Sequence, residues 1–540
     1  MNRIIAFILV FCTMAVGLFA KPARRDALTL TQPDGTQLTA YQHGDAFFHY
    51  YTDIQGNMLE QSSDGYYHAI VMPLAEELEA RRMNNPRRIA LQQMVGGELN
   101  LAPRGLIILV NFTNLEFKTT AAEIDSMLNG QNYTRHYSFV SDGRRRTITS
   151  SGSARQYFQD NSFGQYNPVF DVVGPVTLSQ SYSYYGKNNA SGNDQHADSM
   201  IKEACELVDD QVDFAIYDNN NDGKVDFVYV LYAGYGEADG AGANYVWPHN
   251  FKLSYSQECT VDGKLVDNYA CSNEVDYASK QHDGIGTFCH EFSHVLGLPD
   301  LYATEKNLFH KTLGMWDILD YGPYNNDGNT PPCYSAYERF YVGWLKPTVI
   351  NKACDVQLPA LHESNAVVLL TSKGTHNLMG ASPNPTTFYL LENRQQAGWD
   401  KYLPGHGLLV TKITYNLYRW MSNTVNNSPN SMGVDLIEAD GEAPKYSASD
   451  PSSIGYFGKA EDAYPAGSTS FTALASYHVT DIREEDGVVF FQVNGGGETI
   501  ALEVENTIIP NNPTVRKVFR DGQILIEHNG VCYDLFGNKY

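Results

Sequence analysis

The sequence predicts a multidomain protein with a central α/β domain, a small β-rich unit before it and all-β structure after it. The chain has 540 residues, which is too long for one ordinary hydrophobic core. Aromatic residues make up 12% of the chain, and flat rings pack well on the pleated surface of strands. In the central part, strand-like apolar runs come first and longer helical stretches follow, which indicates an α/β fold.

Residues 1–20 have the pattern of a signal peptide. Arg3 supplies a positive charge, residues 4–19 are almost continuously apolar, and the small residue Ala20 stands before the charged stretch that starts at Lys21. We expect cleavage after Ala20, and the alternative is an uncleaved membrane anchor. No later stretch is long and apolar enough to span a bilayer. The mature protein is therefore predicted to be secreted, extracellular or at the cell surface, without a transmembrane anchor.

Residues 21–100 are predicted to form a first, β-rich unit. Short strands are expected at residues 29–31, 47–51 and 66–71, separated by glycine-containing turns, and a helical stretch at residues 74–83 follows. Two basic pairs, Arg81-Arg82 and Arg87-Arg88, come near the end of this unit. A small unit that ends in exposed basic pairs indicates a removable prosegment, and the alternative is an ordinary small domain with a charged linker. The unit has no cysteine, so latency through a cysteine thiolate is excluded.

Residues 101–350 are predicted to form the α/β domain. Its first strand, residues 104–112, contains the run Leu-Ile-Ile-Leu-Val, which is typical of a fully buried strand. Further strands are expected at residues 169–178 and 225–232. Helices are expected at residues 121–128, 153–158, 197–208, 283–296 and 334–344.

The region after residue 350 is predicted to be all-β. Strand-like runs, with Gly, Asn and Pro between them, occur at residues 367–371, 387–392, 407–413, 433–439 and 487–493. A β-sandwich is therefore expected for residues 351–494. The triglycine at residues 495–497 is expected to act as a flexible joint. Residues 495–540 would then form a short β module, either an export or sorting signal or a simple accessory hairpin.

The residues with the clearest chemistry lie on the helix expected at residues 283–296. His290 and His294 are one turn apart on the same helix face, so both imidazoles can point at one metal ion. Glu291 is offset by one residue and can reach a water held by the metal. Gly297 favours a left-handed reversal, after which Asp300 can return as a third ligand. This HExxHxxGxxD pattern predicts a zinc site with three protein ligands and Glu291 as general base.

The start of this helix and the identity of the third ligand need separate comment. Asp283 is a plausible N-cap of the helix. Glu338, on a second predicted helix, is a rival third ligand, as in zinc enzymes that take a glutamate from a second helix. Asp300 fits better because Gly297 supplies the required reversal of the chain.

Later segments extend the pattern beyond the helix. They are residues 314–322 (GMWDILDYG), 335–345 (SAYERFYVGWL), 391–395 (LENRQ), 398–400 (GWD) and 436–441 (LIEADG). Together with the helix motif they resemble the immune inhibitor A-type metallopeptidases, over about residues 100–490. The resemblance implies a metzincin-like zincin catalytic domain and a bacterial protein exported as a zymogen. It also implies protein or peptide substrates, with the chain's own prosegment as inhibitor.

The chain departs from that family at one position below the zinc site. Relatives of this type usually have a methionine where this chain has Leu319. A leucine fills an apolar floor at similar volume, so the substitution is expected to be tolerated. Tyr321 or Tyr324 could donate a hydrogen bond to the oxyanion of the reaction, or they are packing tyrosines.

A possible calcium loop lies before the strand expected at residues 225–232. Oxygen-bearing residues alternate there, with Gly223 at the bend, as in an EF-hand loop. The candidate ligands are Asp218, Asn220, Asp222, Lys224 through its carbonyl, and Asp226. The twelfth position is Tyr229 rather than glutamate, so another carboxylate such as Asp213 would have to complete the shell. The alternative is a solvated turn rich in Asx residues.

Composition excludes several other classes of function. The formal net charge of −24 makes nucleic acid an improbable partner, because an acidic surface repels phosphates. Neither a GxSxG elbow, a phosphate-binding loop nor a dinucleotide fingerprint is present. The seven cysteines after the signal peptide do not form a disulfide framework, although Cys259 and Cys271 could pair across a hairpin.

The sequence thus predicts a secreted zinc-dependent endopeptidase that hydrolyses protein substrates with a zinc-held water activated by Glu291. Zinc is expected as the catalytic metal and calcium as a structural ion. The alternative from a different class is a catalytically silent, calcium-stabilised surface or adhesion protein on a peptidase-like fold. The intact Glu291 favours the enzyme.

Overall fold

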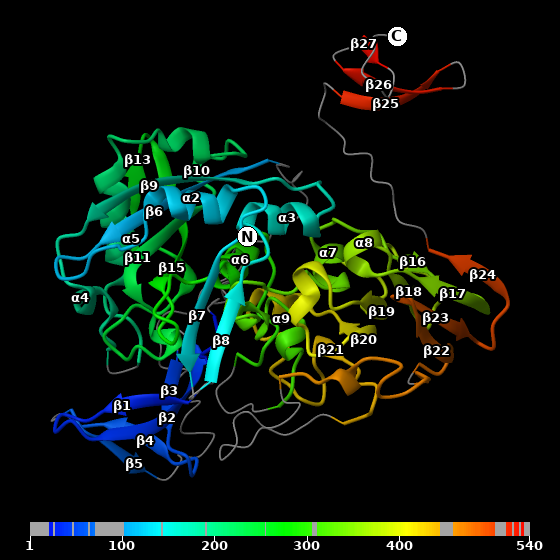
Figure 1. The fold of residues 1–540 in the computed structure, drawn as a ribbon, viewed down its shortest axis with the longest axis horizontal. Helices are drawn as coiled ribbons and strands as arrows, with labels where there is room; N and C mark the ends of the chain where they lie inside the picture. Colours follow the sequence, from blue (N-terminus) through cyan, green and yellow to red (C-terminus); the bar gives the residue numbers. More distant parts are fainter. Residues whose placement is uncertain are drawn as a thin grey trace, which may run out of the picture.

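The α/β part and the β-rich part of the chain pack against each other in the computed structural model, and a small sheet lies beside them (Figure 1). The structure describes residues 21–24, 27–45, 48–62, 65–70, 102–141, 144–189, 192–253, 255–304, 310–442, 457–472, 474–502, 515–520, 523–528 and 531–533. Within these ranges, no helix has the length and apolar character needed to cross a membrane. The signal peptide and the helix expected at residues 74–83 lie outside the described residues.

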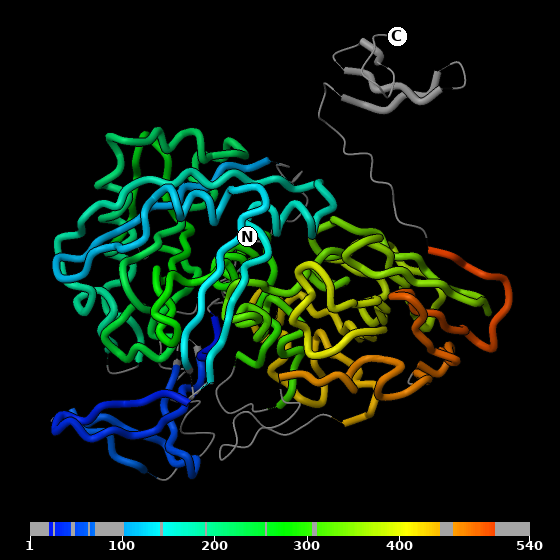
Figure 2. Tube along the Cα trace, viewed as in Figure 1, coloured from blue at the N-terminus to red at the C-terminus, as the bar shows by residue number. Residues whose placement is uncertain are grey.

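The N-terminal unit is a five-stranded antiparallel sheet in the order β1-β2-β3-β4-β5. Its strands are β1 (Leu28–Thr31), β2 (Gln37–Asp45), β3 (Phe48–Thr52), β4 (Met58–Gln61) and β5 (Tyr67–Ile70). The three strands expected from the sequence are present, and two more, β2 and β4, complete the meander. Figure 2 shows this sheet in blue at the lower left, next to the main body.

The α/β part is built on a five-stranded sheet in the order β12-β15-β11-β6-β9. Its strands are β6 (Arg104–Asn111), β9 (Val169–Thr177), β11 (Val228–Tyr235), β12 (His249–Lys252) and β15 (Asn268–Val275). All neighbours pair in parallel except β12, which runs antiparallel at one edge. The strand expected at residues 225–232 is in fact two, the short β10 (Lys224–Val225) and β11.

Helices cover both faces of this sheet, which explains why β6 is apolar at successive positions. The helices are α2 (Ala121–Asn129), α3 (Ala154–Asn161), α4 (Tyr182–Gly186), α5 (Ala197–Val208), α6 (Gly286–Val295) and α7 (Ala336–Tyr341). Ile107 and Leu109 of β6 share a core with α2, α3 and α6. Leu106 and Ile108 point to the opposite core, which α5 closes.

Smaller elements complete the α/β part. They are the hairpin β7 (His136–Ser141) and β8 (Arg144–Thr149), the strands β13 (Cys259–Val261) and β14 (Lys264–Val266), and the short 3-10 helices η1 (Phe214–Tyr217), η2 (Glu237–Asp239), η3 (Tyr255–Gln257), η4 (Gly314–Trp316) and η5 (Gly322–Tyr324).

Two sheets follow, in the orders β16-β18-β19-β20-β21 and β22-β23-β17-β24. Their strands are β16 (Thr348–Val349), β17 (Cys354–Leu358), β18 (Val368–Leu370), β19 (Thr387–Arg394), β20 (Gly407–Thr414), β21 (Val434–Leu436), β22 (Val479–Glu485), β23 (Val488–Val493) and β24 (Glu498–Ala501). Short helices α8 (Leu361–Ser364), α9 (Leu417–Met421) and η7 (Ala460–Asp462), with η6 (Gly398–Tyr402), lie between them. Apolar side chains of both sheets form one shared core.

This β-rich region shares an apolar core with the α/β part. Phe388, Leu390 and Leu409 belong to the same apolar core as the helices α3, α6 and α7. Beyond the triglycine, β24 pairs in parallel with β17, so the sheet continues past the expected joint. Another small sheet follows, made of β25 (Val515–Arg520), β26 (Gln523–His528) and β27 (Val531–Tyr533). The division into domains therefore stays a prediction.

A buried ion pair ties the two parts together. The Arg394 guanidinium meets the Asp400 carboxylate with two bonds, Nε to Oδ2 at 2.7 Å and Nη2 to Oδ1 at 2.6 Å. It also donates to the carbonyls of Trp316 and Cys333 in the α/β part. Both side chains of the pair are fully buried.

We expect Arg394→Met to lower the free energy of unfolding by about 3–5 kcal/mol, because it leaves Asp400 as an uncompensated buried charge. The measurement is the urea denaturation midpoint. Arg483→Met is the matched control, since Arg483 pairs with Asp481 and Glu485 on the surface, where a pair contributes about 0–1 kcal/mol. Equal shifts for the two variants would contradict this account.

Candidate metal centre and active site

The helix α6 (Gly286–Val295) begins at Gly286. Asp283, the expected N-cap, lies before this start and does not cap the helix. Ile285 is the residue before the helix, and Asp283 instead accepts hydrogen bonds from the Gly284 N–H and the Thr287 hydroxyl. Gly286 donates its N–H to the Gly328 carbonyl at 2.8 Å. A Cβ at Gly286 would lie 2.1 Å from the Pro323 carbonyl oxygen, so only glycine lets this loop pack against the start of the helix.

The end of α6 confirms the reversal expected at Gly297, whose φ is +83°. The Gly297 N–H bonds to the His294 carbonyl at 3.0 Å, and the Leu298 N–H bonds to the Ser293 carbonyl at 3.3 Å. This pair of bonds is the Schellman motif, which closes a helix with a left-handed residue. The chain then turns back and brings Asp300 beside the helix it has just left.

Three ligand atoms converge where this reversal ends. The His290 Nε2 lies 3.3 Å from the His294 Nε2, and the Asp300 Oδ1 lies 3.2 Å from the first nitrogen and 3.5 Å from the second. Each imidazole uses its Nδ1 on a backbone carbonyl, that of Ile318 or that of Leu298, both at 2.8 Å. The Nδ1 atoms therefore carry the hydrogens, and both Nε2 atoms present lone pairs.

This arrangement fits a tetrahedral metal ion. Two neutral imidazole nitrogens and a carboxylate oxygen face one another with no hydrogen between them, and the Asp300 Oδ1 accepts no hydrogen bond within the described residues. Their separations match the edge of a tetrahedron, about 3.3 Å, for ligands about 2.0–2.1 Å from a zinc ion. All three side chains are buried, and burial lowers the pKa of His294 to about 4. The donor set is that of a zinc site with one open position.

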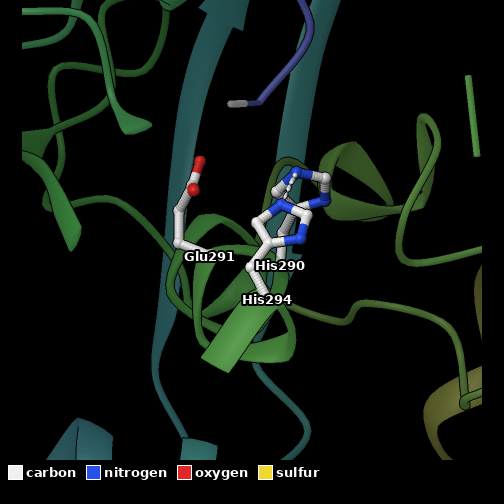
Figure 3. A group of neighbouring side chains, drawn as sticks. All are labelled: His290, Glu291 and His294. Atoms are coloured by element: carbon white, nitrogen blue, oxygen red, sulfur yellow. Dashed lines mark hydrogen bonds between the residues drawn. The ribbon is translucent and has the colours of Figure 1, made fainter. Parts of the chain in front are cut away.

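Glu291 lies beside His290 and His294 (Figure 3). One ligand atom from each of His290, Glu291 and His294 lies within 4.8 Å of the other two. The Oε1 atom accepts a hydrogen bond from the Lys21 backbone N–H at 2.9 Å, while Oε2 accepts none within the described residues. Burial raises the pKa of Glu291 to about 7, although nearby His290 lowers it. Glu291 therefore presents one buried carboxylate oxygen beside the two imidazoles, and its role as general base stays a prediction.

A residue that the sequence did not indicate holds the third ligand. The Asn423 side chain accepts the Asp300 N–H at 2.8 Å and donates from Nδ2 to the Asp300 Oδ2 at 2.7 Å. Asn423 is buried and follows α9 in the β-rich region. Its carbonyl also accepts the Thr304 hydroxyl at 2.6 Å. The Asp300 carboxylate is therefore oriented from the β-rich region, with Oδ1 left for the metal.

Leu319 and Glu338 do not approach the ligands as donors. Leu319 is fully buried in the apolar core, and its carbonyl accepts the Leu301 N–H at 2.7 Å, which holds the loop that carries Asp300. Glu338 caps its own helix, where its Oε2 accepts the Ser335 N–H at 2.6 Å. The geometry therefore favours Asp300 over Glu338 as third ligand.

The two tyrosines differ in their surroundings. The Tyr324 hydroxyl donates to the Pro22 carbonyl at 2.6 Å, so it binds the N-terminal segment. The Tyr321 ring packs edge-on against Phe457. The role of either tyrosine at the oxyanion stays a prediction.

The predicted calcium loop uses its oxygens within the protein. The Asp218 Oδ2 accepts the Lys264 ammonium at 2.6 Å and the Gly223 N–H at 3.0 Å. Asp226 accepts the Asn219 N–H and the Asn220 side-chain amide. Asp222 accepts the Lys224 N–H. Lys264 thus pairs with Asp218, the most buried carboxylate of the loop. This geometry does not favour a calcium site. The candidate ligands of that site were Asp218, Asn220, Asp222, Lys224 and Asp226.

The disulfide that Cys259 and Cys271 could form is not present. The six cysteines whose side chains the structure describes are free. Cys271 is buried in β15 next to the His249 imidazole, whereas the pKa of Cys259 is lowered by a hydrogen bond with Cys205. The two thiols therefore face different neighbours.

We expect Asn423→Ala to weaken zinc binding about 10–100-fold, because the Asp300 carboxylate loses its orienting partner. Competition with a chromogenic chelator measures the affinity. Asn426→Ala is the control, since Asn426 donates to the neighbouring Leu301 carbonyl without touching Asp300. An equal loss of zinc affinity in both variants would show that the segment acts only through general stability.

Comparisons with known proteins agree with this geometry. Residues 99–345 match the family described as immune inhibitor A peptidase M6, catalytic domain. The pre-pro-metalloprotease PrtV of Vibrio cholerae serotype O1 is 27% identical over 217 residues, which cover 35% of this chain and 23% of that protein. Immune inhibitor A of Bacillus thuringiensis subsp. alesti is 23% identical over 285 residues, 47% of this chain and 41% of that protein. The match thus spans less than half of either relative. Residues 99–345 are thus similar to the catalytic domain of the immune inhibitor A peptidase M6 family.

Proposed function

We propose that the chain is a secreted zinc-dependent endopeptidase that acts on protein substrates. The observation that carries this proposal is the convergence of His290, His294 and Asp300, with Glu291 beside them, in a domain of a peptidase family. Export would follow removal of residues 1–20. A binding protein without catalysis has no chemical need for a buried, unpaired carboxylate oxygen such as the Glu291 Oε2.

The metal-binding residues and Glu291 would have different roles in peptide hydrolysis. His290, His294 and Asp300 would hold the zinc, which as a Lewis acid polarises the substrate carbonyl and favours deprotonation of water. Glu291 takes a proton from the attacking water and passes it to the nitrogen of the broken peptide bond. The Ile318 and Leu298 carbonyls keep both imidazoles in the orientation that this requires.

Glu291→Gln is expected to lower casein hydrolysis at least about 100-fold, since the amide cannot accept the proton. Zinc content should stay at one ion per chain, because Glu291 is not a ligand. The measurements are chelator-sensitive casein hydrolysis and metal analysis of the same sample, with Glu206→Gln, an exposed acid on α5, as control. Full activity in Glu291→Gln would exclude the mechanism.

We also propose that the N-terminal unit keeps the enzyme latent by filling the site. Residues 21–24 are buried, and the Lys21 N–H donates a hydrogen bond to the Glu291 carboxylate. If cleavage follows Ala20, this nitrogen is the α-amino group of the mature chain. The unit makes a second contact through His49 of β3, whose Nε2 lies 2.8 Å from the Glu237 Oε1 and whose ring stacks on Trp247.

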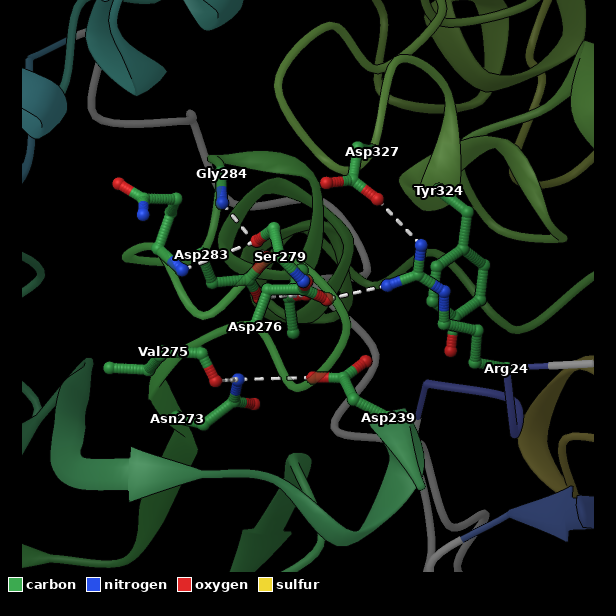
Figure 4. A network of polar contacts seen from close by, with 12 residues as sticks. Arg24, Asp239, Asn273, Val275, Asp276, Ser279, Asp283, Gly284, Tyr324 and Asp327 are labelled. Atoms are coloured by element: carbon green, nitrogen blue, oxygen red, sulfur yellow. Dashed lines mark hydrogen bonds and ion pairs between the residues drawn. The ribbon is translucent and has the colours of Figure 1, made fainter. Parts of the chain in front are cut away.

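Arg24 anchors this segment by two carboxylates (Figure 4). Its guanidinium lies 2.5 Å from the Asp276 Oδ2 and 2.6 Å from the Asp327 Oδ1. Its backbone N–H donates to the Ala238 carbonyl at 2.9 Å. Burial raises the pKa of Asp276, but Arg24, hydrogen bonds from Ser279 and the charge of Lys21 together outweigh burial, so the net pKa is lowered. Arg24 and Lys21 of the bound segment therefore help to keep Asp276 ionised.

Arg24→Ala in the full chain should raise the activity measured before any processing, because the segment loses its anchor. We expect an increase of about tenfold or more, since a broken buried charge pair costs about 2–5 kcal/mol. Chelator-sensitive casein hydrolysis by the intact chain measures it. Arg104→Ala, which breaks a surface pair with Asp171, is the control. Unchanged activity in a folded, zinc-loaded Arg24→Ala chain would refute latency through this segment.

A further inference from the structure

The N-terminal segment lies against Glu291 as a cleaved product would. In peptide hydrolysis water adds its hydroxyl to the carbonyl carbon, the C–N bond breaks, and Glu291 passes the proton to the leaving nitrogen. The Lys21 nitrogen is hydrogen-bonded to the Glu291 Oε1 at 2.9 Å, which is the place of that leaving nitrogen. Lys21 therefore occupies the position of the residue that follows the scissile bond.

The backbone of this segment is held by groups that accept any sequence. The indole Nε1 of Trp247 donates to the Lys21 carbonyl at 3.0 Å, and the Tyr324 hydroxyl donates to the Pro22 carbonyl. The Arg24 N–H donates to the Ala238 carbonyl, next to the sheet strand β11. Discrimination among substrates must therefore come from the side-chain pockets.

The pocket of the Lys21 side chain is built around its charge. The ammonium Nζ lies 3.1 Å from the Asp239 Oδ1 and 2.7 Å from the Thr287 Oγ1, and 4.5 Å from the centre of the Tyr324 ring. The Lys21 side chain is 3% exposed and that of Asp239 is 1% exposed, so water does not share this contact. A buried carboxylate of this kind discriminates strongly against a neutral side chain.

Other parts of the catalytic domain hold both acceptors in place. The Asp239 Oδ2 accepts the Asn273 side-chain amide at 3.0 Å, which leaves Oδ1 for the ligand (Figure 4). Thr287 lies in the first turn of α6 and donates its hydroxyl hydrogen to the Asp283 Oδ2 at 2.9 Å. Its oxygen is thereby available only as an acceptor. Both groups are oriented for a cation by residues outside the N-terminal segment.

The shape of the pocket distinguishes lysine from arginine. Two oxygens close around a single nitrogen, which suits a compact ammonium. Arg24, in contrast, is bound by two carboxylates that flank its planar fork.

We infer that this pocket is the substrate subsite on the leaving-group side of the scissile bond, and that the enzyme cleaves peptide bonds preceding lysine. The inference rests on the proposed peptidase function and adds its substrate class. The N-terminal segment keeps the enzyme latent because its Lys21 occupies the pocket that would bind the lysine of a substrate.

The test compares two peptides that differ only in the residue after the scissile bond, lysine or norleucine, which has the same chain without the ammonium. The full chain is first activated by limited trypsin digestion, and the trypsin is then inhibited. We expect kcat/KM to be at least about 30-fold higher for the lysine peptide. The tetrapeptide Lys-Pro-Ala-Arg should also inhibit more strongly than its norleucine analogue, and this comparison needs no variant.

Asp239→Asn is expected to bring the kcat/KM ratio of the two peptides close to one. Asp267→Asn, which removes an aspartate paired with Lys224 and Lys252 outside the cleft, should keep the ratio of the unmodified protein. Chelator-sensitive casein hydrolysis without a preference for lysine would overturn the subsite while leaving the peptidase function intact. Absence of any chelator-sensitive hydrolysis would instead overturn the peptidase function. If Asp239→Asn fails to fold, the peptide and inhibitor comparisons on the unmodified protein decide.

Discussion

The left-handed turn at Gly297 is the constraint on which the site depends. A helix can bring His290 and His294 to one face, but it carries every later residue away along its axis. The Schellman closure at Gly297 ends that progress and returns Asp300 to within 3.5 Å of both imidazoles. Three buried ligand atoms then meet, and a metal cation shared between them would make that arrangement favourable.

The rest of the structure holds this arrangement from several directions. The loop after α6 supplies the Ile318 carbonyl, which fixes one imidazole. The β-rich region supplies Asn423, which fixes the Asp300 carboxylate. The two regions are in turn joined by one apolar core and by the Arg394–Asp400 pair. The candidate metal centre therefore draws on residues of both regions.

Buried carboxylates connect the latency and the substrate preference that we propose. The N-terminal segment lies against buried carboxylates, among them Asp239 and Asp276, which are costly to bury without a cation. Lys21 and Arg24 of the segment pair with them. In the mechanism that we propose, a basic substrate side chain takes the place of Lys21 at Asp239 after activation. The same charges would then recognise both the inhibitory segment and the substrate.

Local sequence signals predicted the parts of the structure that depend on neighbouring residues. The buried strand β6, the helix with its two histidines and the glycine reversal all follow from spacing within a few residues. Contacts between distant segments carried no such signal. Asn423 lies 123 residues from Asp300, and the start of α6 is set by Gly328 packing on Gly286. The calcium motif had the right spacing, but Lys264 comes from another strand to meet Asp218.

Zinc-edge X-ray absorption on the purified full chain, combined with metal analysis, tests the central claim most directly. The account predicts one zinc per chain, with two imidazole nitrogens at about 2.0–2.1 Å and oxygen in the remaining positions. In an Asp300→Ala chain the two imidazoles should remain while the zinc affinity falls. A folded chain that retains no zinc, or zinc bound without imidazole, would contradict the account.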